Sequence, residues 1–152
     1  MTPDQLKQHI LKDIEVELAD EFDKNFERKG FFADRWEPRH YQNPKGSLLM
    51  VTGRLRRSIK SHIEQDGVRF TSDTPYAGVH NEGGTVNQNV RAHNRRNKKT
   101  GKTHQVRAHQ RRLTMPKRQF VGDGPDTQRI IKECIDRNLE QFAKDLANRL
   151  NP

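Results

Sequence analysis

One stretch of 40 residues constrains the fold of this chain more than any other feature. From Gly83 to Gly122 the sequence holds eleven lysines and arginines and no aspartate or glutamate. The remainder has 18 basic and 20 acidic residues, so a near-neutral domain carries one strongly cationic segment. Such a segment favours a polyanionic partner, either nucleic acid or an acidic protein surface. The alternative is a basic loop that is merely solvated.

The cationic segment also contains an internal near-repeat. Residues 90–96 read Val-Arg-Ala-His-Asn-Arg-Arg, and residues 106–112 repeat them as Val-Arg-Ala-His-Gln-Arg-Arg. A polar stretch with a turn glycine, residues 97–102, separates the two copies. Two similar strands around a turn predict a long β-hairpin, which forms an arm at about residues 85–114.

The alternation of side chains along a strand predicts how this arm presents its charge. A register that brings the valine and alanine faces of the two copies together also gathers six basic side chains on one face: Arg91, His93, Arg95, Arg107, His109 and Arg111. Like charges directly opposite each other are unfavourable unless something neutralises them. We therefore predict that these residues, with Arg96 and Arg112, contact an anionic partner, either DNA phosphates or carboxylates of an adjoining subunit.

Long helices are predicted at both ends of the chain. Thr2 and Gln5 match a capping box, and apolar residues then recur every four positions until Gly30, the expected stop. A second helix of about 25 residues is predicted from Pro125 onward. Its apolar residues fall within an arc of roughly 120° at 100° per residue: Ile131, Ile135, Leu139, Phe142, Ala143, Leu146 and Leu150.

Shorter elements are predicted between these helices. The Asp66-Gly67 turn signal predicts a hairpin between strands at residues 59–63 and 68–71. Thr52 is expected to cap a short helix over residues 53–58.

A second short helix completes the predicted middle of the chain. Asp73 or Thr74 is expected to cap a helix that begins at Pro75 and stops at Gly83. The sequence thus predicts one α+β domain over residues 1–152. It consists of a small antiparallel sheet with a long β-hairpin arm, flanked by long N- and C-terminal helices.

The core of such a domain must be small. Hydrophobic residues make up 30% of the chain, charged residues 32%, and the mean hydropathy is −1.12. Oligomerisation would supplement so lean a core. Phe31, Phe32 and Trp36 fall in an irregular segment, residues 31–47, and are expected to pin it onto the core or onto a neighbouring subunit.

The sequence offers no catalytic constellation. It has neither a Gly-x-x-x-x-Gly-Lys phosphate loop nor a Gly-x-Ser-x-Gly elbow. His93, His104 and His109 suggest a metal site, but no cysteine and no carboxylate of the arm stand beside them. The lone Cys134 lies in an apolar helical pattern, where a buried small side chain is expected. We therefore expect no enzyme, no cofactor and no bound metal.

No segment reads as a membrane span or as a signal peptide. The longest apolar runs fall well short of the ~20 residues of a membrane-spanning helix. The first residues lack a basic stretch followed by an apolar one. The sequence predicts a protein made and used in the cytoplasm, or in something that is assembled there.

Four short motifs occur in order along the chain. They are Phe26…Trp36-Glu37-Pro38, Thr52-Gly53-Arg54-Leu55-Arg56-Arg57-Ser58-Ile59, Tyr76-Ala77-x-x-His80-x-x-Gly83 and Met115-Pro116-x-Arg118-Gln119-Phe120-x-Gly122. Together they resemble the Mu-type virion morphogenesis and tail-completion proteins, over roughly residues 20–150. The motif residues are expected to serve as scaffold and assembly surface: Trp36, Thr52, Gly53, Arg54, Leu55, Tyr76, His80, Gly83, Pro116 and Phe120.

The resemblance implies a phage or prophage structural protein of the head–tail junction, in the neck or at tail completion. Such subunits assemble with themselves into a ring, usually taken as hexameric. Further partners would be other neck and tail proteins and the DNA that passes through the junction, with no membrane involved. The protein would stand in the virion, and in the host cytoplasm during assembly. The alternative from the residues alone is a general cationic nucleic-acid-binding protein.

Overall fold

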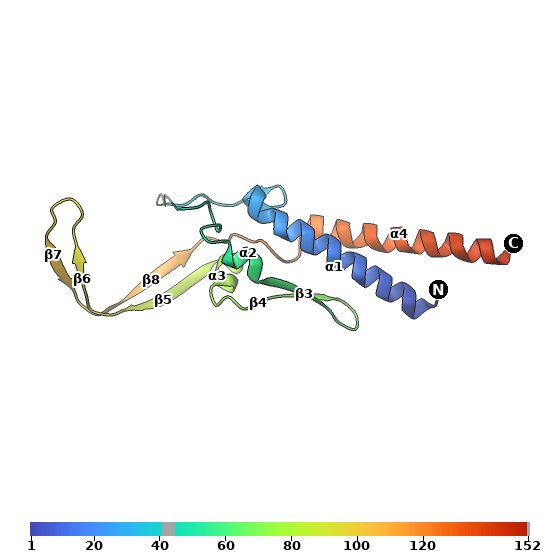
Figure 1. Ribbon diagram of the computed structural model, residues 1–152, viewed down its shortest axis with the longest axis horizontal. Coiled ribbons are helices and arrows are strands. Elements are labelled where there is room, and N and C mark those ends of the chain that lie inside the picture. The colour runs from blue at the N-terminus through green and yellow to red at the C-terminus, as the bar shows by residue number, and fades with distance from the viewer. Residues whose placement is uncertain (41–44, 152) are drawn as a thin grey trace.

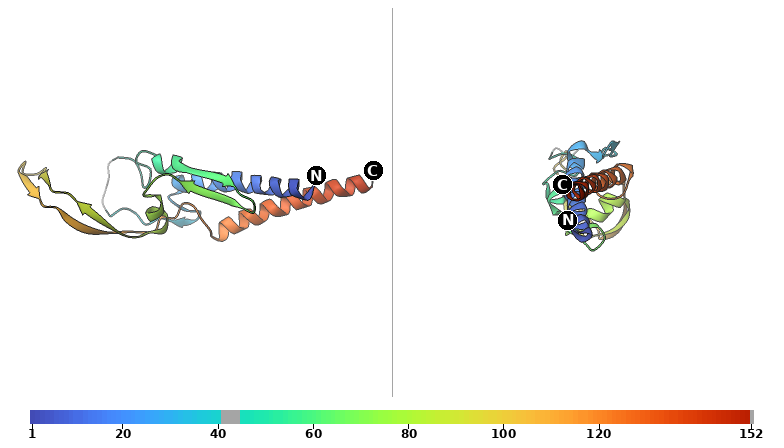
Figure 2. Two further views of the ribbon diagram at one scale, coloured as in Figure 1. Left: turned by 90° about the horizontal axis from the view of Figure 1, so that it is seen from below. Right: turned by 90° about the vertical axis from the view of Figure 1, so that its right-hand side faces the viewer.

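The computed structural model describes residues 1–40 and 45–151 of an elongated molecule (Figure 1). Two long helices lie side by side at one end, and a β-hairpin arm extends from the other end (Figure 2). The described residues form four two-stranded antiparallel sheets rather than one larger sheet. The predicted α+β architecture with long terminal helices is confirmed.

The first helix, α1 (Pro3–Arg28), begins as the sequence predicts. The Thr2 hydroxyl accepts a hydrogen bond from the backbone N–H of Gln5, and the Gln5 side chain accepts one from the N–H of Thr2. The helix ends before Gly30, however, because Lys29 adopts the left-handed conformation with φ of 56°.

Gly30 instead opens a tight hairpin of β1 (Gly30–Phe31) and β2 (Asp34–Arg35). A Cβ atom at Gly30 would lie 2.5 Å from the carbonyl oxygen of Asp34, so glycine lets the two strands approach each other.

Two clusters of buried side chains form the core. The first joins α1 to α4 through Ile14, Leu18, Phe22, Ile130 and Cys134, and Phe31 and Phe32 pack against it. The second lies at the root of the arm and consists of Phe26, Trp36, Leu55, Ala77 and Phe120. The aromatic residues after α1 therefore cover the chain's own core, the first of the two arrangements that the sequence allowed.

The middle of the chain holds the predicted hairpin and a short helix before it. Strands β3 (Ile59–Ile63) and β4 (Val68–Ser72) confirm the hairpin. Helix α2 (Arg54–Ser58) is capped by Gly53 in a left-handed conformation, so the prediction of Thr52 as the cap is wrong. The Thr52 hydroxyl still accepts a hydrogen bond of 3.3 Å from the N–H of Arg54, but it lies one residue too early to cap the helix.

Helix α3 (Ala77–Glu82) begins later than predicted. Its cap is Tyr76, not Asp73 or Thr74. The carbonyl of Thr74 accepts a hydrogen bond of 3.0 Å from the N–H of Ala77, so the chain makes a turn before the helix starts. The predicted stop at Gly83 is confirmed.

Helix α4 (Pro125–Leu150) starts at the predicted proline but is only partly covered. Its buried residues are Thr127, Ile130 and Cys134 in the first turns. Farther along the predicted apolar face, Leu139 and Leu146 are each 47% exposed and Leu150 is 72% exposed. Arg137 and Asn138 still contact Asp13 of α1, whereas the end of α4 extends past the N-terminus of α1 (Figures 1 and 2).

Candidate functional site

The predicted arm is a two-part β-hairpin. Strand β5 (Gly84–Val90) pairs with β8 (His109–Met115) near the body. Strand β6 (His93–Arg96) pairs with β7 (Thr103–Val106) toward the tip. The turn is closed by a hydrogen bond of 2.8 Å from the N–H of Asn97 to the carbonyl of Lys102.

The register of the arm differs from the predicted one. Val90 lies opposite His109 and His93 opposite Val106, so the valine of each repeat faces the histidine of the other. Directly opposite residues share a face of an antiparallel ladder, so His109 shares a face with Val90 and not with His93. The prediction that Arg91, His93, Arg95, Arg107, His109 and Arg111 form one face is therefore wrong.

This register also removes the expected clash of like charges. Arg111 lies opposite Gln88, Arg112 opposite Asn87, and Arg96 opposite Thr103. The Nε atom of Arg111 donates a hydrogen bond of 2.7 Å to the Gln88 side chain. These three arginines therefore face neutral partners, whereas Arg95 lies opposite His104. Basic side chains stand on both faces of the arm.

The arm bends between its two ladders (Figure 1). The Arg-Ala steps of the two repeats, residues 91–92 and 107–108, lie in this break and belong to neither ladder. In each repeat the histidine contacts its own chain: His93 Nδ1 lies 2.9 Å from the Arg91 carbonyl oxygen, and His109 Nδ1 lies 2.8 Å from that of Arg107. The sequence repeat thus forms two matching halves of one bend.

The eight basic residues predicted to contact an anion are all exposed: Arg91, His93, Arg95, Arg96, Arg107, His109, Arg111 and Arg112. None of the salt bridges between residues of the described ranges involves the arm. The positive charge of the arm is therefore not neutralised within the chain and remains accessible to a partner.

The residues of the four motifs meet at the base of the arm. Phe120 packs on Phe26, with ring centroids 5.1 Å apart, and Phe26 packs on Trp36 at 5.9 Å. Gly83 adopts φ of 70°, and a Cβ atom there would lie 2.7 Å from the backbone nitrogen of Lys117. The two strands that leave the body can approach here because glycine has no side chain. Pro116 directly follows β8 at the same crossing.

Two asparagines that the sequence analysis did not single out hold this base together. Asn25 is fully buried, and its amide donates a hydrogen bond of 3.0 Å to the carbonyl of Phe120. The Asn81 side-chain oxygen accepts hydrogen bonds from the N–H groups of Phe120 and Val121. The one available signal was an asparagine within the apolar stripe of α1.

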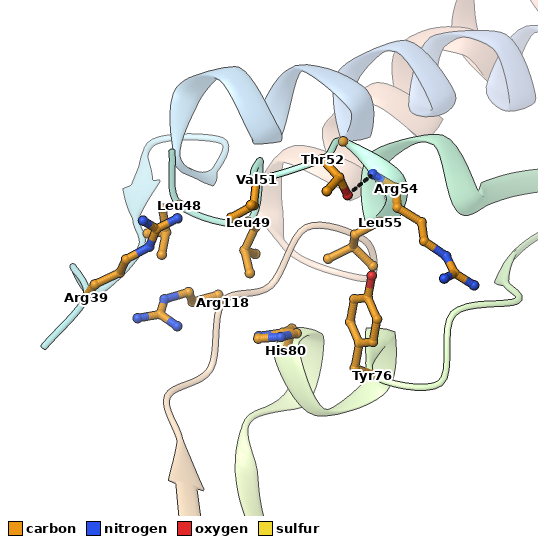
Figure 3. A pocket seen from close by; sticks show the side chains of 11 residues that line it. Arg39, Leu48, Leu49, Val51, Thr52, Arg54, Leu55, Tyr76, His80 and Arg118 are labelled. Carbon is orange, nitrogen blue, oxygen red and sulfur yellow. Dashed lines mark hydrogen bonds between the residues drawn. The ribbon is translucent and has the colours of Figure 1, made fainter. Parts of the chain in front are cut away.

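A pocket of about 320 Å³ lies beside this base (Figure 3). Six of the ten motif residues line it: Thr52, Gly53, Arg54, Leu55, Tyr76 and His80. The other lining residues are Arg39, Leu48, Leu49, Val51 and Arg118. The motifs thus build one surface cavity as well as the root of the arm.

Arg118 and His80 give the pocket its electrostatic character. Arg118 is only 6% exposed, and its Nε donates a hydrogen bond of 2.9 Å to the carbonyl of Glu37. Burial lowers the pKa of Arg118. Burial, and secondly the charge of Arg118, lower the pKa of His80. The Nδ1 atom of His80 is buried without a hydrogen-bond partner in the described part of the chain.

An ion-pair cluster fixes helix α2, whose Leu55 enters the core, to α1. Arg56 donates hydrogen bonds of 2.7 and 2.5 Å to the Asp23 carboxylate and one of 2.8 Å to Glu27. The hydrogen bond from Arg56 lowers the pKa of Asp23.

Within residues 1–40 and 45–151, no group of three or more His, Cys, Asp or Glu is placed to hold a metal ion. No helix in the same ranges combines the length and apolarity needed to cross a membrane.

The sequence model of the phage virion morphogenesis family matches residues 4–140. This range includes all of α1 but its first residue, all four motifs, the arm and the covered part of α4. No curated protein and no solved structure matches the chain.

Proposed function

Because the chain belongs to the phage virion morphogenesis family, we propose that it is a structural subunit of the head–tail junction that completes the tail. In this proposal it assembles with further copies into a ring and contacts other neck and tail proteins. It acts by binding rather than by catalysis. The protein assembles in the host cytoplasm and remains in the virion.

The observation that carries the proposal is the combination of an anchored base with an unneutralised arm. The motif residues bury the root of the arm in the second core cluster, where hydrogen bonds from Asn25 and Trp36 hold the segment between β8 and α4. The arm itself adds no buried side chain and exposes its arginines. A cationic element held out from a fixed support is suited to engage a partner at a distance from the subunit.

We propose that this partner is the DNA that passes through the junction. Arginines stand on both faces of the ribbon, and Lys98, Lys99 and Lys102 surround its turn. Charge on every side suits a polyanion that surrounds or follows the arm better than a single flat protein surface. Phosphate contacts of this kind require no base recognition.

Disruption of the gene in its phage tests the proposed function. Electron microscopy of the lysate should then find filled heads and tails that are not joined, and mass spectrometry should detect the protein in purified wild-type particles. Joined particles in the absence of the gene would contradict the proposal. A cationic nucleic-acid-binding protein that acts outside the virion would be absent from purified particles.

A further inference from the structure

Among the described residues, two of the surface features that have no role in the proposed function differ in their chemistry. One is the end of α4, which extends beyond α1. The other is the pocket at the base of the arm. They lie far apart along the molecule, so one chain cannot bring them together (Figure 1).

The end of α4 presents an apolar face without a cover. Leu139, Phe142 and Leu146 follow each other at intervals of three and four residues, the spacing of helix faces that pack against a partner. Leu139 and Leu146 are among the large apolar side chains that the chain leaves exposed. Glu140 follows Leu139, about 100° farther around the helix, and it is exposed and forms no ion pair with a described residue.

The pocket at the base of the arm offers apolar side chains and positive charge, which complement the apolar face and Glu140 at the end of α4. Leu48, Leu49, Val51 and Leu55 form an apolar side, and three arginines, Arg39, Arg54 and Arg118, stand around it (Figure 3). None of the described residues that line it is an aspartate or glutamate.

The buried Arg118 makes a carboxylate the expected ligand. Its guanidinium donates to two carbonyl oxygens, those of Glu37 and Pro38, but forms no salt bridge with a described carboxylate. A buried cation gains from a nearby anion more than an exposed one does. A cavity of about 320 Å³ with one apolar side accommodates a few side chains, which fits a carboxylate beside apolar groups better than a DNA backbone.

We propose that the projecting end of α4 of one copy docks into the pocket of a second copy. Apolar side chains from the Leu139–Leu146 face pack against Leu48, Leu49 and Val51, and Glu140 lies among the arginines. Such a contact joins two different surfaces, so each copy keeps one free pocket and one free helix end. Head-to-tail contacts of this kind close into rings. The inference rests on the proposed ring and names the surfaces that form it.

Two variants of the full-length protein separate the two surfaces. The pocket variant V51D/R54E places two carboxylates in the pocket at exposed positions, and Val51 is 48% exposed. The helix variant L139S/L146S removes apolar groups that contribute little to the monomer core. Matched controls are V16D, at a residue 55% exposed on α1, and K144S on another side of α4. Circular dichroism and thermal unfolding verify the fold of each variant.

Mass photometry and sedimentation measure the result. We expect each variant alone to associate at least tenfold more weakly than the wild type and the controls. An equimolar mixture of the two variants should form dimers and nothing larger, because one intact pocket and one intact helix end remain in it.

Three outcomes would overturn the proposal. A pocket variant that associates like the wild type would exclude this contact but leave a ring through other surfaces. Variants that fail to form a dimer in the mixture would exclude the pairing of these two surfaces. A wild-type protein that remains monomeric at all concentrations would remove both the contact and the self-assembled ring. A protein that associates as expected but is absent from particles would contradict only the proposed function.

Discussion

The indole Nε1 of Trp36 donates a hydrogen bond of 2.7 Å to the carbonyl oxygen of Gln119, 83 residues farther along the chain. This bond joins the segment after α1 to the segment between the arm and α4. It fixes the root of the arm, since Trp36 also packs edge-on against Phe26 in the second core cluster.

Replacement of Trp36 tests how much its contacts at the root of the arm contribute to the free energy of unfolding. Trp36→Phe removes the hydrogen bond to the part-buried carbonyl of Gln119, which should cost about 1–3 kcal/mol of unfolding free energy. Trp36→Ala should cost more, about 3–5 kcal/mol, because it also removes the buried ring. Urea unfolding followed by circular dichroism measures both. Equal stability of the wild type and Trp36→Phe would show that the bond contributes nothing.

The stability of the fold at the base of the arm should depend on pH through the titration of His80. Burial and Arg118 lower the pKa of His80, so the unfolded chain, with an ordinary value near 6.5, binds a proton more readily than the folded one. The free energy of unfolding should therefore fall as the pH drops below about 6.5, until the folded imidazole is itself protonated. His80→Gln should lose less stability between pH 7.5 and pH 5.5 than the wild type. Parallel losses in the two proteins would contradict this role of His80.

Engineered cysteines test the register of the arm. Gln88 and Arg111 lie opposite each other, and their side chains are hydrogen-bonded. Gln88→Cys with Arg111→Cys should form a disulfide under mild oxidation, which a gel-shift of thiol-labelled protein detects. The register that would align the valines with the alanines pairs residue 88 with Gln110 instead. Faster oxidation of a Gln88→Cys/Gln110→Cys pair would contradict the structure, and the buried Cys134 should not interfere.

The anionic partner of the arm can be identified by substitution and salt. Replacement of Arg91, Arg95, Arg107 and Arg111 with Gln should leave the fold intact, because all four side chains are exposed. Binding to double-stranded DNA should weaken, and the slope of log K against log salt should fall by roughly one for each phosphate that the arm no longer neutralises. Gln substitutions at four exposed body residues, Arg35, Lys60, Lys144 and Arg149, form the control.

The same measurement against polyglutamate separates the two kinds of partner. Loss of binding to polyglutamate alone would indicate an acidic protein surface. Unchanged binding to both polymers would mean that the arm is only a solvated loop.

Local signals predicted the elements of this fold better than their pairing. The capping box at Thr2 and Gln5, the Asp66-Gly67 turn and the start at Pro125 all depend on neighbouring residues, and all three are confirmed. The arm register was not predictable from the repeat. The bonded turn between Asn97 and Lys102 sets the offset, which places unlike residues opposite each other.

Long-range contacts set the rest of the site. The apolar pattern of α4 indicates a packed helix but not what covers it, and the described contacts of α4 with α1 extend to Arg137 and Asn138 but not to the end of the helix. The four motifs suggested a scaffold, yet the pocket they form also needs Arg39, Leu48, Leu49 and Val51 from the segment between the first two motifs. Sequence spacing alone does not bring such residues together.

Addition of purified protein to a lysate that lacks it, followed by the titre of infectious phage, measures whether this protein joins heads to tails. Wild-type protein should join the separate heads and tails and restore the titre by several orders of magnitude. The four-arginine arm variant should restore far less than the matched body control. A lysate that is fully infectious without the protein would contradict the account.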